Sequence, residues 1–234
     1  MCIRDSLKTQ ALEKSFTLPV DSEWGQTYVQ EMHVVPGSPA SIVVELFVNV
    51  DPAEDGAALY NDSGLVNWIP GNSVVNGANR ALSMDSFTFT SSSMIYGLPE
   101  PQLGTYFIEV PVSPSGLSYT GASSGDTNVP TSSIVRSDGT LLYTNSGEVW
   151  NPSAMTLLGT YLESNGSQIF YAPSVIPETA NSHTYFLDAY AQYSQYEAVN
   201  IDVYDQSKMC IRDRYSPSCA RESGGPRVPH RNQA

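Results

Sequence analysis

The chain has 234 residues and carries 11 Lys or Arg against 24 Asp or Glu, a formal net charge of −13 at pH 7. An acidic surface of this kind repels phosphate backbones and anionic lipid headgroups, so it excludes nucleic acid as a partner and argues against direct membrane contact. The length allows one large domain, or two of about 100 residues that each bury a core.

Period-two patterns predict short strands along the whole chain. Between residues 40 and 50, Ile42, Val44 and Leu46 alternate with residues such as Glu45, which predicts a half-buried strand. The predicted strands, in chain order, are residues 27–35, 40–50, 57–60, 65–69, 82–90, 105–112, 133–136, 140–143, 155–162, 168–172, 184–193 and 196–204. Turn residues that tolerate positive φ, such as those at 62–64 and 138–139, separate several of them. About a dozen short strands without a helical pattern predict an all-β fold, an antiparallel β-sandwich.

Residues 114–130 divide this pattern because they are rich in Ser, Gly and Thr and poor in bulky apolar side chains. A linker here would separate one sandwich at residues 7–113 from a second at residues 131–208. The alternative is a long loop inside one larger sandwich.

A six-residue string occurs near both ends of the chain. Residues 1–6 read MCIRDS and residues 209–214 read MCIRDR. The DNA string ATGTGTATAAGAGACAG followed by any base encodes both, because Ser and Arg share codons that begin with AG. This string resembles the transposase mosaic end used to prepare sequencing libraries. The resemblance implies that both copies are adapter and that residues 209–234 are an artefact with an unrelated, disordered tail.

The segment between the two copies, residues 7–208, has its own composition. It contains five Lys or Arg, 21 Asp or Glu and no cysteine, because the three cysteines lie at positions 2, 210 and 219. We therefore expect a strongly acidic domain without disulfides or thiolate metal sites.

Two parts of the chain resemble known extracellular modules. Residues 159–162 read GTYL, residues 165–173 read NGSQIFYAP, residues 183–190 read HTYFLDAY and residues 198–205 read AVNIDVYD. They resemble the final strands of bacterial Ig-like or cadherin-like surface repeats, but the acidic turn of those repeats is replaced after Asp188 by AYAQY. Residues 51–112, with ALYNDSG at 58–64 and GTYFIEV at 104–110, resemble the β-sandwich domains appended to secreted peptidases. The resemblances imply an Ig-like or jelly-roll-like fold, in two tandem sandwiches, and a binding or spacing role.

One cluster of carboxylates is a candidate metal site. Asp51, Glu54 and Asp55 follow a predicted strand, and Asp62 comes shortly after them. Calcium prefers several hard oxygen ligands from flexible loops. The spacing differs from an EF-hand loop, because Ala53 offers no side-chain oxygen. We expect a solvated acidic hairpin, with a calcium site as the alternative and no other cofactor.

Tyrosines are frequent in the last two predicted strands. Tyr190 and Tyr196 are candidates for contact with a ligand or a protein interface, because an exposed tyrosine stacks on sugar rings and enriches interfaces. Tyr185 and Tyr193 share a face with Leu187, so they are predicted to lie in the core. Ordinary strand composition is the alternative for the whole set.

The sequence offers little for catalysis. Residues 121–125 read GASSG, but the sequence that follows cannot form the helix that a nucleophile elbow requires. Neither His33 nor His183 has a second histidine four residues later, and His33 is predicted to be a partly buried strand residue. We expect a non-enzymatic binding, adhesion or spacer module of an extracellular or cell-surface protein, with a protein or carbohydrate ligand. The alternatives are a virion structural protein, such as a tail, fibre or decoration protein, and the accessory domain of a secreted hydrolase.

Overall fold

The computed structural model describes residues 14–49, 54–71, 74–75, 78–79, 82, 84–99, 106–119, 134–163, 166–169, 172–192 and 195–208. Side chains are described in these ranges except at residues 54–55, 74–75, 78–79, 188–192, 195–200 and 208. The predicted all-β fold is confirmed: every strand pair is antiparallel, and the one helical element of the described residues is a 3₁₀ turn at Gln206–Lys208. In these ranges, no helix has the length and apolar character needed to cross a membrane.

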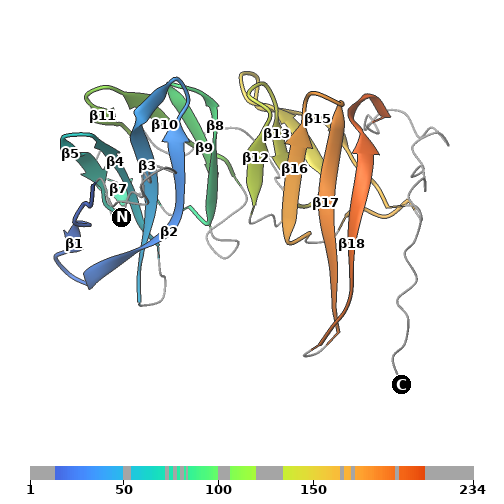
Figure 1. The fold of residues 1–234 in the computed structure, drawn as a ribbon, viewed down its shortest axis with the longest axis horizontal. Coiled ribbons are helices and arrows are strands. Elements are labelled where there is room, and N and C mark those ends of the chain that lie inside the picture. The colour runs from blue at the N-terminus through green and yellow to red at the C-terminus, as the bar shows by residue number, and fades with distance from the viewer. Residues whose placement is uncertain are drawn as a thin grey trace, which may run out of the picture.

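The strands form four main sheets and one small two-stranded pair (Figure 1). The first sheet has the order β1-β2-β3-β4-β5, with β1 Val20–Asp21, β2 Gly25–Val35, β3 Ser38–Val48, β4 Glu54–Asn61 and β5 Gly64–Ile69. The second has the order β11-β10-β9-β8, with β8 Ser86–Ser91, β9 Met94–Leu98, β10 Ile108–Ser113 and β11 Gly116–Leu117. The third has the order β12-β13-β14-β15, with β12 Val135–Ser137, β13 Leu142–Thr144, β14 Glu148–Asn151 and β15 Thr156–Thr160. The fourth has the order β16-β17-β18, with β16 Ser174–Glu178, β17 His183–Gln192 and β18 Gln195–Asp205. The small pair is β6 Val74–Val75 with β7 Ala78–Asn79.

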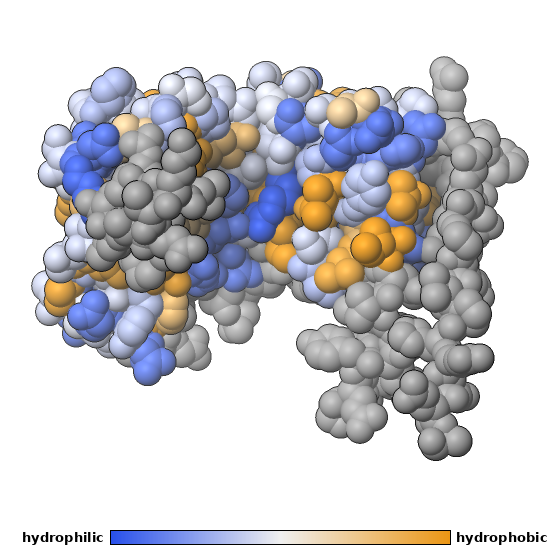
Figure 2. All heavy atoms as spheres, in the orientation of Figure 1, coloured by the Kyte–Doolittle hydropathy of each residue, from blue (hydrophilic) through white to orange (hydrophobic). Residues whose placement is uncertain are grey.

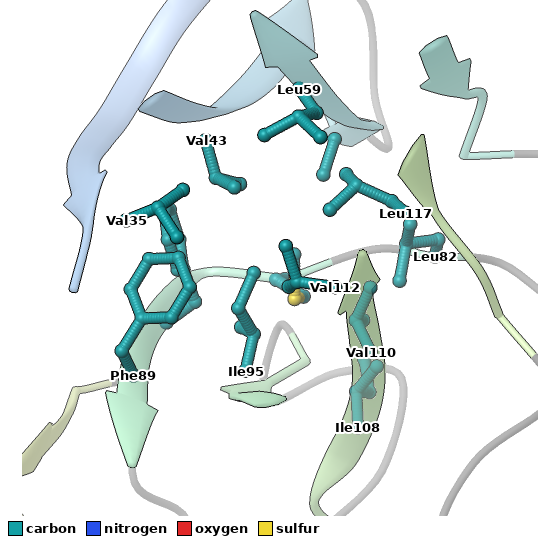
Figure 3. Close-up of a cluster of buried hydrophobic side chains, with 13 residues drawn as sticks. Val35, Val43, Leu59, Leu82, Phe89, Ile95, Ile108, Val110, Val112 and Leu117 are labelled. Carbon is teal, nitrogen blue, oxygen red and sulfur yellow. The ribbon is translucent and has the colours of Figure 1, made fainter. Parts of the chain in front are cut away.

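The first two sheets face each other across a shared apolar core. Val43 and Leu59 of the first sheet pack in one cluster with Phe89, Ile95 and Val110 of the second (Figure 3). Because successive side chains of a strand point to opposite faces, each sheet contributes only alternate residues to this cluster. The two sheets therefore share one apolar core.

The opposite face of the second sheet is also buried. Tyr96 and Leu98 of β9, with Phe107 just before β10, pack against Leu142 of β13 and Trp150 of β14. The rings of Phe107 and Trp150 meet edge to face with centroids 5.6 Å apart. The second and third sheets therefore share a core of their own.

A further core lies on the other side of the third sheet. Tyr143 and Val149 pack there with Val175, Phe186 and Tyr204 of the fourth sheet. The four main sheets consequently follow one another as layers in a stack, and the second and third sheets are buried on both faces.

The prediction that the strand at residues 40–50 is half-buried is wrong. Val43 and Val44 are both almost fully buried, although they point to opposite faces of β3. Phe16 and Leu18 pack on the outer face of the first sheet, where Val44 lies, and Tyr60 donates a hydrogen bond of 3.2 Å to the carbonyl of Thr17. The segment before β1 thus covers part of a face that the period-two pattern assigned to solvent.

Several strands differ from the predicted ones for identifiable reasons. β9 and β14 are buried on both faces, so they show no alternation in sequence. β16 contains Pro177, which lowers strand propensity. Of the strand predicted at 168–172, residues 170–171 lie outside the described residues, and Gln168 forms an isolated bridge with Leu162. Most of the predicted linker, residues 120–130, lies outside the described residues.

Candidate functional site

Glu31 and Arg136 form an ion pair between the first and third sheets. The Oε1 atom of Glu31 on β2 lies 2.8 Å from the Nη2 atom of Arg136 on β12. The side chains are 19% and 31% exposed, so solvent screens the pair only in part. This contact spans the edge of the second sheet and connects two halves of the chain that are distant in sequence.

The second sheet takes part in the same contact through β8. The Nη1 atom of Arg136 donates hydrogen bonds of 2.8 Å to the hydroxyl of Ser86 and to the carbonyl of Val135. The amide of Phe87 donates a hydrogen bond of 3.1 Å to Oε2 of Glu31. Glu31, Ser86 and Arg136 are therefore called the joint, because they connect β2, β8 and β12.

The environment of the joint favours the ionised form of Glu31. Burial alone would raise the pKa of this carboxyl, but the contact with His33, the charge of Arg136 and the amide of Phe87 together lower it. His33 Nε2 lies 3.0 Å from Glu31 Oε1, and its ring packs edge to face on Phe87 with centroids 4.6 Å apart. His33 is thus a partly buried strand residue, as predicted.

The joint has the chemistry of a structural contact. Ser86 is 3% exposed, and its hydroxyl accepts a hydrogen bond from Arg136 and a weaker one of 3.4 Å from the amide of Val135. A nucleophilic serine needs a free path to a substrate, whereas this one lies in the interior. The joint was not predicted from the sequence. The signal that could have pointed to it is the scarcity of cations, because Arg136 is one of only five Lys or Arg in residues 7–208.

The outer face of the fourth sheet is an exposed apolar surface. Ile176 on β16 and Val203 on β18 are the register partners of Tyr185 on β17, and Ile201 pairs with Leu187. Ile176 is 59% exposed, Ile201 67% and Val203 42%. Figure 2 shows hydrophobic residues gathered over this part of the molecule. These five residues are called the β16–β18 face.

One end of the β16–β18 face carries a polar row across the sheet. Glu178, His183 and Asp205 are neighbours in the registers of the three strands. The carboxylate of Glu178 accepts hydrogen bonds from the amides of Ala180 and Asn181, which lower its pKa. The face therefore ends in a polar row in which the lowered pKa keeps Glu178 ionised near neutral pH.

The opposite end of the stack also exposes apolar side chains. Met32 and Val34 on β2 and Leu65 on β5 are 49%, 56% and 46% exposed. Met32 and Val34 pair with Val44 and Ile42, so they extend the face on which Phe16 and Leu18 pack. This end is thus partly covered by the chain itself.

The predicted carboxylate cluster is only partly described. Asp51 lies outside the described residues, and so do the side chains of Glu54 and Asp55, whose backbone belongs to β4. Asp62 is exposed in the turn between β4 and β5. Among the side chains that the structure describes, no group of three His, Cys, Asp or Glu could hold a metal ion.

The predicted tyrosine site is also only partly described. Tyr190 and Tyr196 belong to β17 and β18, but their side chains are outside the described set, as is the whole of Tyr193. The prediction that Tyr185 is a core residue is wrong. Phe186 and Thr184 point into the core, so Tyr185 lies on the outer face with Ile176 and Val203.

A comparison with models of known protein families gave no match, and a comparison with curated proteins gave none either. The joint and the β16–β18 face are therefore the features from which a function can be inferred.

Proposed function

We propose that residues 7–208 form a non-enzymatic binding and spacer module of an extracellular or cell-surface protein. The observation that carries the proposal is the combination of a joint that connects three sheets with an apolar face left open at one end of the stack. A spacer needs a fixed geometry between its ends, and a binding module needs an accessible apolar surface.

The buried contacts between the second and third sheets support the spacer role. Phe107 and Trp150 are 0% and 4% exposed, and Tyr96 donates a hydrogen bond of 3.3 Å to the carbonyl of Pro152. Domains joined by a flexible linker alone would leave such aromatic residues in water.

The β16–β18 face supports the binding role. Isolated exposed apolar residues are common on protein surfaces, but contiguous ones mark sites of interaction. Ile176, Tyr185 and Val203 are contiguous because they are register neighbours on three adjacent strands.

Sequencing the uninterrupted gene in the source DNA tests this proposed function. We expect reads that pass beyond codons 1–6 and 209–214 to leave the repeated string and to continue into a frame with an export signal and further β-rich domains. A catalytic domain in the same frame, or neighbouring genes for a virion portal or sheath, would contradict the proposal.

A further inference from the structure

The tip of the β4–β5 hairpin carries an asparagine in a modification motif. Residues 61–63 read NDS, which fits the acceptor pattern for N-linked glycans: asparagine, any residue except proline, then serine or threonine. The pattern occurs at one other place in the chain, residues 165–167, whose asparagine lies outside the described residues. A pattern of three residues arises easily by chance, so its position in the fold decides its meaning.

The structure places residues 61–63 at an accessible turn. Asn61 is the last residue of β4, Gly64 is the first residue of β5, and the two are register partners. Asp62 and Ser63 between them are exposed, and Asn61 is partly exposed. An acceptor asparagine has to reach an enzyme, and a hairpin tip on the surface meets this requirement.

The side chain of Asn61 is held in a defined orientation. Its Oδ1 atom accepts a hydrogen bond of 2.7 Å from the amide of Ser63, which closes an Asx turn. Because Oδ1 points back to the backbone, the Nδ2 atom of the same planar amide lies on its other side. The turn therefore carries Nδ2 of Asn61 and the hydroxyl of Ser63, the two groups of the acceptor motif, at the surface.

A similar turn in the third sheet lacks the acceptor sequence. Asn151 ends β14, and its Oδ1 atom accepts a hydrogen bond of 2.9 Å from the amide of Ser153. Pro152 occupies the middle position, which excludes this triplet from the pattern. Pro152 is also buried, and its carbonyl accepts a hydrogen bond from the hydroxyl of Tyr96. The same hydrogen bond thus occurs once with an acceptor sequence on the surface and once without.

We propose that Asn61 is the attachment site of an N-linked glycan. The co-substrate is an oligosaccharide joined to a lipid through a diphosphate. Transfer breaks the bond between the anomeric carbon and the diphosphate oxygen, and it forms a bond between that carbon and Nδ2 of Asn61. The nitrogen gives up one proton, and the lipid diphosphate leaves. The proposal rests on the proposed function, because a chain meets this donor during export.

The glycan would lie at the end of the stack remote from the β16–β18 face. Asn61 belongs to the first sheet, whereas that face is the outer face of the fourth. A glycan at the hairpin tip therefore leaves the β16–β18 face open for a ligand. It also adds polar surface close to Leu65, the second residue of β5, which is 46% exposed.

The test translates the full chain, behind a cleavable export signal, in the presence of microsomes that supply the donor and the transferase. An added Asn-Gly-Thr triplet after the signal reports entry into the microsomes. Asn165→Gln is present throughout, so that Asn61 is the acceptor that is read. We expect two glycans on this chain, seen as a mass increase that a peptide N-glycosidase removes. Asn61→Gln is expected to leave one.

Variants of the turn separate the motif from the fold. Ser63→Ala removes the hydroxyl but keeps the backbone amide that bonds Asn61, and it is expected to abolish the glycan at Asn61. Ser63→Thr keeps the hydroxyl and is expected to retain the glycan. Asp62→Pro reproduces the sequence of residues 151–153 and is expected to abolish it.

Two results would overturn the proposal. The first is a chain in which the added triplet is modified and Asn61 is not. The second is a glycan that persists in full in Ser63→Ala, because the modification would then not depend on the motif. The microsomes supply the donor whatever the origin of the gene, so failure of this proposal is distinguishable from failure of the proposed function.

Discussion

Oε1 of Glu31 on β2 lies 2.8 Å from Nη2 of Arg136 on β12, and this ion pair connects the first sheet of the stack to the third. Between them, β8 contributes the hydroxyl of Ser86 to Arg136 and the amide of Phe87 to Glu31. Each charged group therefore has more than one partner, and this distinguishes the joint from a surface ion pair.

Replacing Arg136 with methionine is expected to lower the free energy of unfolding by about 1–3 kcal/mol, because Glu31 would remain partly buried without its cation. Arg136→Lys, which keeps the charge but loses the fork of donors, is expected to cost less. Urea denaturation measures both. A loss below about 0.5 kcal/mol for the methionine variant would mean that the pair behaves as an exposed one.

The joint also predicts a dependence of stability on pH. The contacts of Glu31 hold its pKa below the ordinary value of 4.5, so its contribution is complete above pH 4.5 and is lost as the pH falls through the lowered pKa. Glu31→Gln has no such titration. We expect the variant to be less stable than the parent at neutral pH and the difference to shrink in acid. Denaturation curves at a series of pH values test this, and a constant difference would contradict it.

Gly56 on β4 is expected to tolerate no side chain. Its φ is +87°, and a Cβ there would overlap the carbonyl oxygen of Ile69 and lie 2.8 Å from the amide nitrogen of Gly71. Because these are backbone atoms that cannot rotate away, Gly56→Ala is expected to cost more than about 3 kcal/mol. Gly139→Ala is the control, since its φ is +91° but nothing lies within 4 Å. It is expected to cost about 1 kcal/mol, and equal melting temperatures for the two variants would refute the argument.

The carboxylates at Asp51, Glu54, Asp55 and Asp62 predict how the melting temperature responds to calcium. Asp62 lies exposed in the turn between β4 and β5, and the sequence around Asp51 favours a solvated loop. We therefore expect the melting temperature to be the same in calcium and in a chelator. A site filled at 100 times its dissociation constant would add about 2.7 kcal/mol, so a clear rise with calcium would establish the alternative that the sequence left open.

The elements that the sequence predicted are those with one buried face or a distinctive turn. The hairpin of β4 and β5 turns at Asp62 and Ser63, where the amide of Ser63 donates a hydrogen bond to Oδ1 of Asn61. The long β17–β18 hairpin was likewise predicted from its alternation.

Burial on two faces explains most of what the sequence did not predict. β9 and β14 lie inside the stack, where an alternating pattern has no physical basis. The joint was not predictable either, because Glu31 and Arg136 meet only once three sheets are stacked. The position of Tyr185 on the outer face was not predicted, because Phe186, its neighbour, takes the core position.

The four sheets are expected to unfold as one cooperative unit, because the core around Phe107 and Trp150 couples the two halves of the stack. Amide hydrogen exchange of the unchanged full chain at a series of urea concentrations reports on both halves in the same molecule, through β3 of the first sheet and β17 of the fourth. We predict that the slowest amides of β3 and β17 open with the same free energy and the same dependence on urea. Two different free energies of opening would contradict a single unit and would make the chain two independent domains.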